Sequence, residues 1–129
     1  MSKKEAAQRT ITLTGRRPVK IYDEEWPVIA VAEGDSYGPR DCGRYQQALA
    51  QLELDTYLLC VRQHADSRVI VYAVFRAATV WTGHKTRSGG ELLATGADIP
   101  AAIRRVGRDC SIPDSVIREC IADLPAEEL

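Results

Sequence analysis

The segment Tyr57–Ala77 constrains the fold of this chain more than any other stretch, because it has the pattern of a β-hairpin. Two runs rich in Val, Ile, Leu, Tyr and Phe flank a short polar group, Ala65–Arg68. β-Branched and aromatic residues suit a pleated, half-buried surface, and a polar group between two such runs favours a tight turn. We therefore predict a hairpin with Asp66 and Ser67 as the two central turn residues.

This two-residue turn also predicts the strand register and the two faces of the hairpin. Leu59 would stand opposite Val74, and Val61 opposite Tyr72, with these four side chains on the core face. The other face would be apolar at the open end and polar near the turn. Ser67 is not ideal in a turn that needs a positive φ, so a longer loop with a shifted register is the alternative.

Two helices are predicted after the hairpin, since apolar residues recur at helical spacing over residues 99–110 and again over 112–124. Asp98 is placed to cap the first helix, and Pro100 lies in its opening turn, where a missing N–H costs little. Ser111–Asp114 has the pattern of a capping box for the second helix. A hairpin followed by a helix pair predicts an α+β fold.

The other segments are predicted as short elements and loops. Short strands are expected at Thr10–Leu13, Pro18–Ile21 and Thr79–Thr82, and loops at Gly34–Gly43 and Gly83–Gly90. A helix over residues 24–33 is favoured by Asp23 as a cap, whereas the β-branched residues that follow Pro27 leave a strand as the alternative. The segment Arg44–Asp55 favours a short helix, with a strand as its alternative.

Taken together, these elements predict a single α+β domain over residues 10–125. A small, mainly antiparallel sheet built on the central hairpin would pack against helices that include the C-terminal pair. Residues 1–9 are expected to form a flexible arm and residues 126–129 an acidic end. The sequence of 129 residues contains neither an apolar run of about 20 residues nor a signal-peptide pattern, so a cytoplasmic protein is expected.

No residue pattern in the sequence predicts catalysis, a metal site or a cofactor. The four cysteines form no CxxC pair and are expected to be buried thiols, and two histidines are too few for a histidine-based metal site. Cys60 and His64 would lie roughly 13 Å apart along a straight strand, far beyond contact. A small hydrolase or transferase would require His84 or Cys42 to meet a partner group in a cleft.

Basic residues supply the candidate binding set. The loop over residues 83–90 contains His84, Lys85 and Arg87 beside two glycines that would let a backbone approach a ligand closely, although it lacks the P-loop pattern. Further candidates lie in the N-terminal segment, on one flank of the first C-terminal helix, and in the polar loop before residue 44; they are Arg16, Arg17, Arg104, Arg105, Arg108, Tyr37 and Arg40. A solvated surface of mixed charge is the alternative to binding for these residues.

Two other surfaces are candidates for binding a macromolecule. The C-terminal helices have the length of a helix-turn-helix, but Glu119 and Asp123 on the second helix oppose contact with phosphates. Trp26 and Tyr37, with Tyr45 and the acidic residues around them, suit a basic partner protein. A core position is the alternative for Trp26.

The segments GGELLATGADIPAAIRRVGRDCSIPDSVIREC and VRQHADSRVIVYAVFRAAT give the chain a resemblance to a group of bacterial proteins. It resembles small uncharacterised accessory proteins of bacterial integrative and conjugative elements. The resemblance implies an accessory protein of a mobile genetic element, a class that includes regulators, stability factors and inhibitors of host defence. It supplies no catalytic residue.

The sequence therefore predicts a non-enzymatic protein that acts by binding a macromolecular partner, as a regulator or inhibitor. A protein partner is favoured. Nucleic-acid binding through the basic loop over residues 83–90 and the helix arginines is the alternative. A net charge of −1 does not decide between them, and the sequence does not indicate an oligomeric state.

Overall fold

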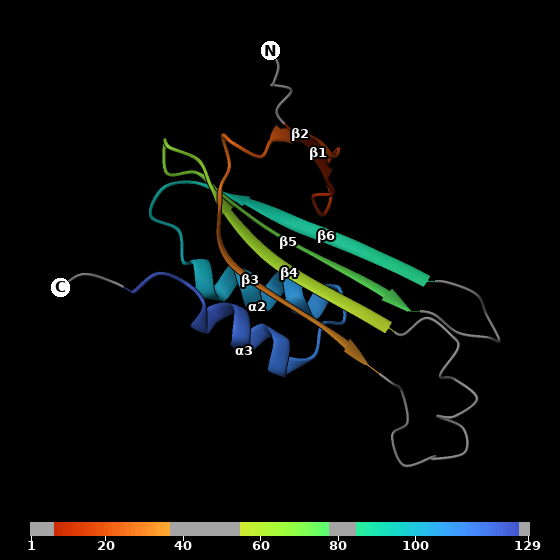
Figure 1. Ribbon diagram of the computed structural model, residues 1–129. Coiled ribbons are helices and arrows are strands. Elements are labelled where there is room, and N and C mark those ends of the chain that lie inside the picture. The colour runs from red at the N-terminus through yellow and green to blue at the C-terminus, as the bar shows by residue number, and fades with distance from the viewer. Residues whose placement is uncertain (1–6, 37–54, 78–84, 127–129) are drawn as a thin grey trace, which may run out of the picture.

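An antiparallel sheet of four strands in the order β3-β4-β5-β6 is the centre of the structure. The strands are β3 (Val28–Ser36), β4 (Asp55–Gln63), β5 (Val69–Ala77) and β6 (Lys85–Leu93). The computed structural model describes residues 7–36, 55–77 and 85–126. Helices α2 (Ile99–Asp109) and α3 (Asp114–Ala122) cover one face, and a hairpin of β1 (Gln8–Ile11) and β2 (Val19–Tyr22) covers part of the other (Figure 1). The predicted single α+β domain with a mainly antiparallel sheet is confirmed.

The central hairpin forms as predicted, but its turn is one residue longer. The amide of His64 donates to the carbonyl of Arg68 at 2.9 Å, and the amide of Ser67 donates to the carbonyl of His64 at 2.9 Å. Ser67 has a φ of 76°, which is the left-handed residue that a three-residue hairpin loop requires. The expected two-residue turn is therefore wrong, and the longer loop is the one the chain adopts.

The longer loop shifts the register by one residue, so each side chain of β5 lies on the opposite face of the sheet from the one expected. Leu59 stands opposite Ala73, and Cys60 opposite Tyr72. Because side chains alternate along a strand, this shift places Tyr72 on the face opposite the one expected. Leu59 and Val61 lie on the helix-covered face as predicted, whereas Tyr72 and Val74, their expected neighbours, lie on the other.

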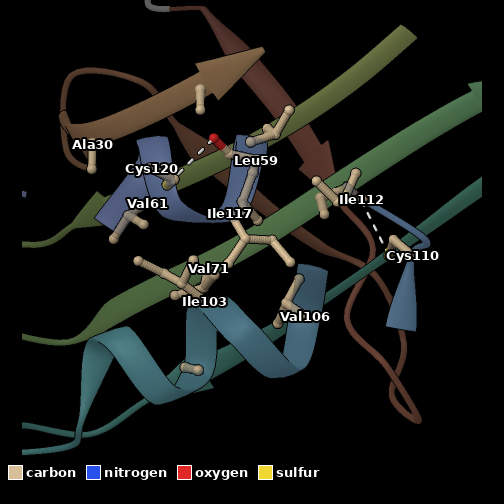
Figure 2. Packing of buried hydrophobic residues seen from close by; sticks show 14 of the residues in the cluster. Ala30, Leu59, Val61, Val71, Ile103, Val106, Cys110, Ile112, Ile117 and Cys120 are labelled. Carbon is tan, nitrogen blue, oxygen red and sulfur yellow. Dashed lines mark hydrogen bonds between the residues drawn. The ribbon is translucent and has the colours of Figure 1, made fainter. Parts of the chain in front are cut away.

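The sheet consequently has an apolar core on each face. The core under the helices joins the sheet to α2 and α3, and Figure 2 shows Leu59, Val61 and Val71 meeting Ile103 and Ile117. The second core lies under the β1–β2 hairpin, and its buried members are Ile11, Leu13, Ile21, Trp26, Cys60, Ile70 and Tyr72. Trp26 is 6% exposed, so it belongs to the core rather than to a binding surface.

Two predicted segments have a different structure. The helix expected over residues 24–33 is wrong: strand β3 begins at Val28, and β-branched residues favour this alternative. The loop expected over Gly83–Gly90 is also wrong from residue 85 onward, because Lys85–Leu93 pairs with β5 along its whole length. Its polar composition reflects a strand at the edge of the sheet.

The N-terminal strands lie close to the predicted ones, at β1 and β2 in place of Thr10–Leu13 and Pro18–Ile21. Gln8 and Arg9, at the end of the segment expected as an arm, belong to β1. The loop expected over Gly34–Gly43 is wrong for residues 34–36, which belong to β3, and its remainder lies outside the described residues. The segment 44–54 and the expected strand Thr79–Thr82 also lie outside the described residues.

The helix pair is confirmed, with one correction at its second cap. Asp98 accepts a hydrogen bond from the amide of Ala101 at 3.2 Å and so caps α2 as expected. Helix α3 begins after Pro113 without a side-chain cap, so the expected capping box at Ser111–Asp114 is wrong. Within the described residues, no helix is long and apolar enough to cross a membrane.

Candidate binding surface

The glycine pair of β6 is explained by the chain's own packing. The amide of Thr14 donates to the carbonyl of Gly90 at 2.9 Å, and the amide of Gly90 donates to the Thr14 hydroxyl at 3.3 Å. A Cβ on Gly90 would lie 2.7 Å from the carbonyl oxygen of Val71, and one on Gly89 would lie 2.7 Å from Thr14 Oγ1. The segment before Arg16 is therefore the backbone that approaches closely, in place of the ligand that the sequence suggested.

Arg87 of β6 is exposed, and two neighbours fix its position. Its guanidinium lies over the Phe75 ring, 5.5 Å from the ring centre, and donates a hydrogen bond to the hydroxyl of Ser111 in the α2–α3 connection. Phe75 in turn stacks on Tyr57 of β4, with ring centres 4.9 Å apart. The side chains of Tyr57, Phe75, Arg87 and Ser111 therefore connect strands β4, β5 and β6 to the helix pair. No carboxylate among the described residues forms an ion pair with Arg87.

Three other predicted basic residues, Arg16, Arg17 and Arg108, belong to segments that contact β6 or the Ser111 connection. Arg16 and Arg17 follow Thr14 and are exposed, so the Thr14–Gly90 contact holds their turn at the outer edge of β6. The carbonyl of Arg108 accepts the Ser111 amide at 3.1 Å, which places the last turn of α2 beside the Arg87 partner. We call Arg16, Arg17, Arg87 and Arg108 the basic surface.

Arg105 is the predicted cation that is already neutralised. Its guanidinium makes two hydrogen bonds to the Glu91 carboxylate of β6, at 2.8 and 2.9 Å. These hydrogen bonds hold the pKa of Glu91 below its usual value and raise the pKa of Arg105. Arg105 therefore ties α2 to β6, whereas Arg104 lies half-buried four residues before Arg108 on the same flank of the helix.

Four of the predicted residues add no side chain to the described surface. His84, Tyr37 and Arg40 lie outside the described residues. Lys85 is the first residue of β6. Tyr57, Phe75 and Ser111 complete the surface and were not predicted, because cross-strand register and the course of the α2–α3 connection bring them to Arg87.

A buried charged network lies on the other face of the sheet. Arg62 is 7% exposed; it donates to the carbonyl of Trp26 at 2.9 Å and to the Tyr72 hydroxyl at 3.2 Å, and lies 3.3 Å from Asp23. Arg9 binds Asp23 through two hydrogen bonds, of 2.7 and 2.8 Å, and with Arg62 it lowers the pKa of that carboxyl. Because every group is paired, this network fastens the β1–β2 hairpin to the sheet.

The thiols and the described histidine have structural surroundings. Cys110 and Cys120 lie in the core, and burial raises the pKa of Cys120 to about 12. His64 packs against Trp26 with ring centres 4.9 Å apart, and its Nδ1 accepts the Asp66 amide at 3.2 Å. Across residues 7–36, 55–77 and 85–126, no group of three or more His, Cys, Asp or Glu residues is arranged to hold a metal ion.

A cleft of about 250 Å³ lies between β1 and the sheet. Thr10 and Thr12 form one wall, Leu58 and Val74 form an aliphatic floor, and Ser88 stands at the β6 side. Arg9, the charged residue of this lining, is neutralised by Asp23. The cleft therefore offers apolar contact and hydroxyl groups, without an unpaired charge to orient a ligand.

Comparison with protein-family models, curated proteins and solved structures gave no significant match to this chain.

Proposed function

We propose that the protein acts by binding a macromolecular partner, a protein with an acidic surface, through the basic surface centred on Arg87. One observation carries the proposal. Arg87 is exposed, is held by the Phe75 ring and the Ser111 hydroxyl, and has no carboxylate partner among the described residues. An arginine that is fixed before binding loses little side-chain entropy when a partner docks.

The neighbourhood of Arg87 suits a protein interface. Interface hot spots are rich in arginine and aromatic residues, and Tyr57 remains partly exposed beside Phe75. Arg16, Arg17 and Arg108 add charge at the periphery, where charged groups mainly raise the rate of association. Such an arrangement fits a carboxylate-bearing patch on the partner that docks on Arg87.

Charge reversal tests the proposal. Tagged wild-type protein, Arg87→Glu and Arg118→Glu are used to capture partners from the native host lysate, with quantification by mass spectrometry. Arg118 is the matched control because it is an exposed arginine on α3, outside the basic surface. We expect one partner to be enriched by the wild type and by Arg118→Glu, and lost with Arg87→Glu.

The affinity change is then measured with the purified partner. Loss of a hot-spot arginine costs about 2 kcal/mol or more, which is roughly a 30-fold rise in Kd. Equal enrichment of the partner by both variants, with unchanged circular dichroism, would exclude Arg87 as the docking centre. Enrichment of no partner by any of the three proteins would count against the binding function.

Nucleic-acid binding is the second candidate, and the position of Arg16 and Arg17 favours it. Their turn is fastened to the edge strand that carries Arg87, so cations from two distant segments lie along one edge. This candidate predicts that affinity for a duplex falls steeply with salt concentration, and that Arg16→Glu and Arg87→Glu each reduce the slope by about one counterion. Duplex binding can be measured by fluorescence anisotropy. Affinity that changes neither with salt concentration nor with either substitution would exclude nucleic-acid binding by this surface.

We further propose that the binding serves a regulatory or inhibitory role in a bacterial mobile element. The support for this context is the resemblance in sequence described above. Genes next to this one that encode conjugation or integration functions would support it, whereas neighbouring genes that encode no such functions in any host would count against it.

A further inference from the structure

The opposite edge of the sheet, at β3, has backbone groups directed outward. The amide of Val31 donates to the carboxylate of Asp123, just after α3, at 3.0 Å, so this amide points away from β4. Backbone groups alternate in direction along an antiparallel strand. The N–H and C=O groups of Glu33 and Asp35 therefore face the same outer edge as those of Val31. Within the described residues, Asp123 supplies the side-chain hydrogen bond to this edge.

Apolar side chains gather around this edge. Tyr22, Val28 and Val31 are the exposed large apolar residues of the described chain, at 44%, 44% and 38%. Val28 and Val31 lie on one face of β3, and Tyr22 begins the turn that leads into the strand. On the other face, Ile29 and Leu124 are half-buried against the helix-covered core.

We propose that the outer edge of β3 binds an extended segment of a partner protein, in which apolar residues alternate with Lys or Arg, as a fifth strand of the sheet. The backbone of the segment would pair with Glu33 and Asp35, and its apolar side chains would cover Val28 and Val31. This interaction uses the edge opposite to the basic surface and does not depend on the function proposed for that surface.

Charge selects a basic segment over a second copy of this chain. Glu24, Glu25, Glu33 and Asp123 are exposed around β3 and its entrance. Antiparallel pairing of β3 with the same strand of a second copy would bring the Asp123 carboxylates of both molecules to one edge, which is unfavourable. A Lys or Arg of an incoming strand would instead pair with Asp123 as the strand carbonyl takes over the Val31 amide.

Two blocked synthetic heptapeptides test this assignment. In one Val alternates with Lys, and in the other Val alternates with Glu. Backbone amide signals of isotope-labelled protein are followed during titration, together with their hydrogen exchange. We expect the Lys peptide to shift the Val31 signal and slow exchange of the Glu33 and Asp35 amides at least tenfold, and the Glu peptide to leave them unchanged.

Variants separate this edge from the basic surface. Glu33→Pro removes an outward N–H without touching the β4 ladder, so it should abolish binding of the Lys peptide. Asp123→Ala leaves the edge backbone intact and removes the carboxylate that would pair with the incoming Lys. It should therefore weaken binding of the Lys peptide, and it tests the proposal should the proline variant unfold. Arg87→Glu is the control and should bind the peptide normally.

Three results would overturn the proposal. The first is exchange of the Glu33 and Asp35 amides that is already slow in the free protein, because the edge is then occupied. The second is an equal response of the edge amides to the two peptides, or no response to either peptide. The third is concentration-dependent dimerisation that protects these amides, which would make a second copy the occupant.

Discussion

Replacing Arg62 by methionine should destabilise the protein by about 3 kcal/mol, because this guanidinium joins the β1–β2 hairpin to the sheet. The two hydrogen bonds to the Trp26 carbonyl and the Tyr72 hydroxyl, at 2.9 and 3.2 Å, have a charged donor, and each is worth about 1.5–3 kcal/mol. We take the lower end for each. Nothing is added for Asp23, because Arg9 still binds it.

The expected loss is a large part of the roughly 5–15 kcal/mol that stabilises a domain. It corresponds to a fall in Tm of about 10 °C for a chain of this length. Methionine keeps the apolar stem as far as the position of Nε, so the change mainly reports the loss of the guanidinium and its hydrogen bonds. Arg118→Met is the control, since that arginine is exposed on α3.

Urea unfolding followed by circular dichroism measures the change, with hydrogen exchange to locate it. Exchange should accelerate most in β1 and β2, while the amides of α3 keep their relative protection. A loss of less than 1 kcal/mol, or acceleration spread evenly over the sheet, would refute the view that Arg62 fastens the hairpin.

Three further outcomes are expected. Gly90→Ala should lower the free energy of unfolding by about 2 kcal/mol, because its Cβ would lie 2.7 Å from a backbone oxygen, whereas Gly34→Ala, with its nearest neighbour at 3.8 Å, should change it by less than about 1 kcal/mol in urea unfolding. The pKa of Asp23 is lowered, chiefly by its hydrogen bond to Arg9. The stabilisation from this carboxylate is therefore complete above the unfolded pKa of about 4 and is lost as pH falls through the folded pKa. Unfolding measured as a function of pH should show that Asp23→Asn loses less stability in acid than the wild type does. The Cys120 thiol, with a pKa of about 12 and no exposed surface, should react with iodoacetamide at pH 8 only after unfolding, which mass spectrometry would detect.

The parts of the fold that depend on local sequence were predictable. Helix α2 is determined by neighbours in the chain, with Asp98 as its cap, Pro100 in its first turn and apolar residues at helical spacing. The central hairpin was equally visible from its two apolar runs. These features require no knowledge of distant residues.

The parts of the fold that depend on contacts between distant residues were not predictable from the sequence. The sequence around strand β3 favours a helix, because Asp23 and the two following glutamates resemble a helix start. Pairing with β4 outweighs that local signal. Strand β6 lacks an alternating apolar pattern, and its glycines accommodate Thr14. The register of the hairpin depended on Ser67 adopting a positive φ, which its residue type disfavours.

The candidate surface shows the same division. Arg87 was found from its charge, because exposed cations are recognisable in a sequence. Its fixed position was not, since Phe75 reaches it by cross-strand pairing and Ser111 by the packing of the helix connection. The Arg105–Glu91 pair likewise removes from the binding set a residue that charge alone had included.

The most direct test of the account is a hydrogen-exchange footprint of the protein with its captured partner. We predict that binding slows exchange of the amides at Arg87 and Ser88 and around Ser111, where β6 meets the α2–α3 connection, and leaves the amides of α3 unchanged. Unchanged exchange at Arg87 and Ser111 in a saturated complex would contradict the claim that this surface binds the partner.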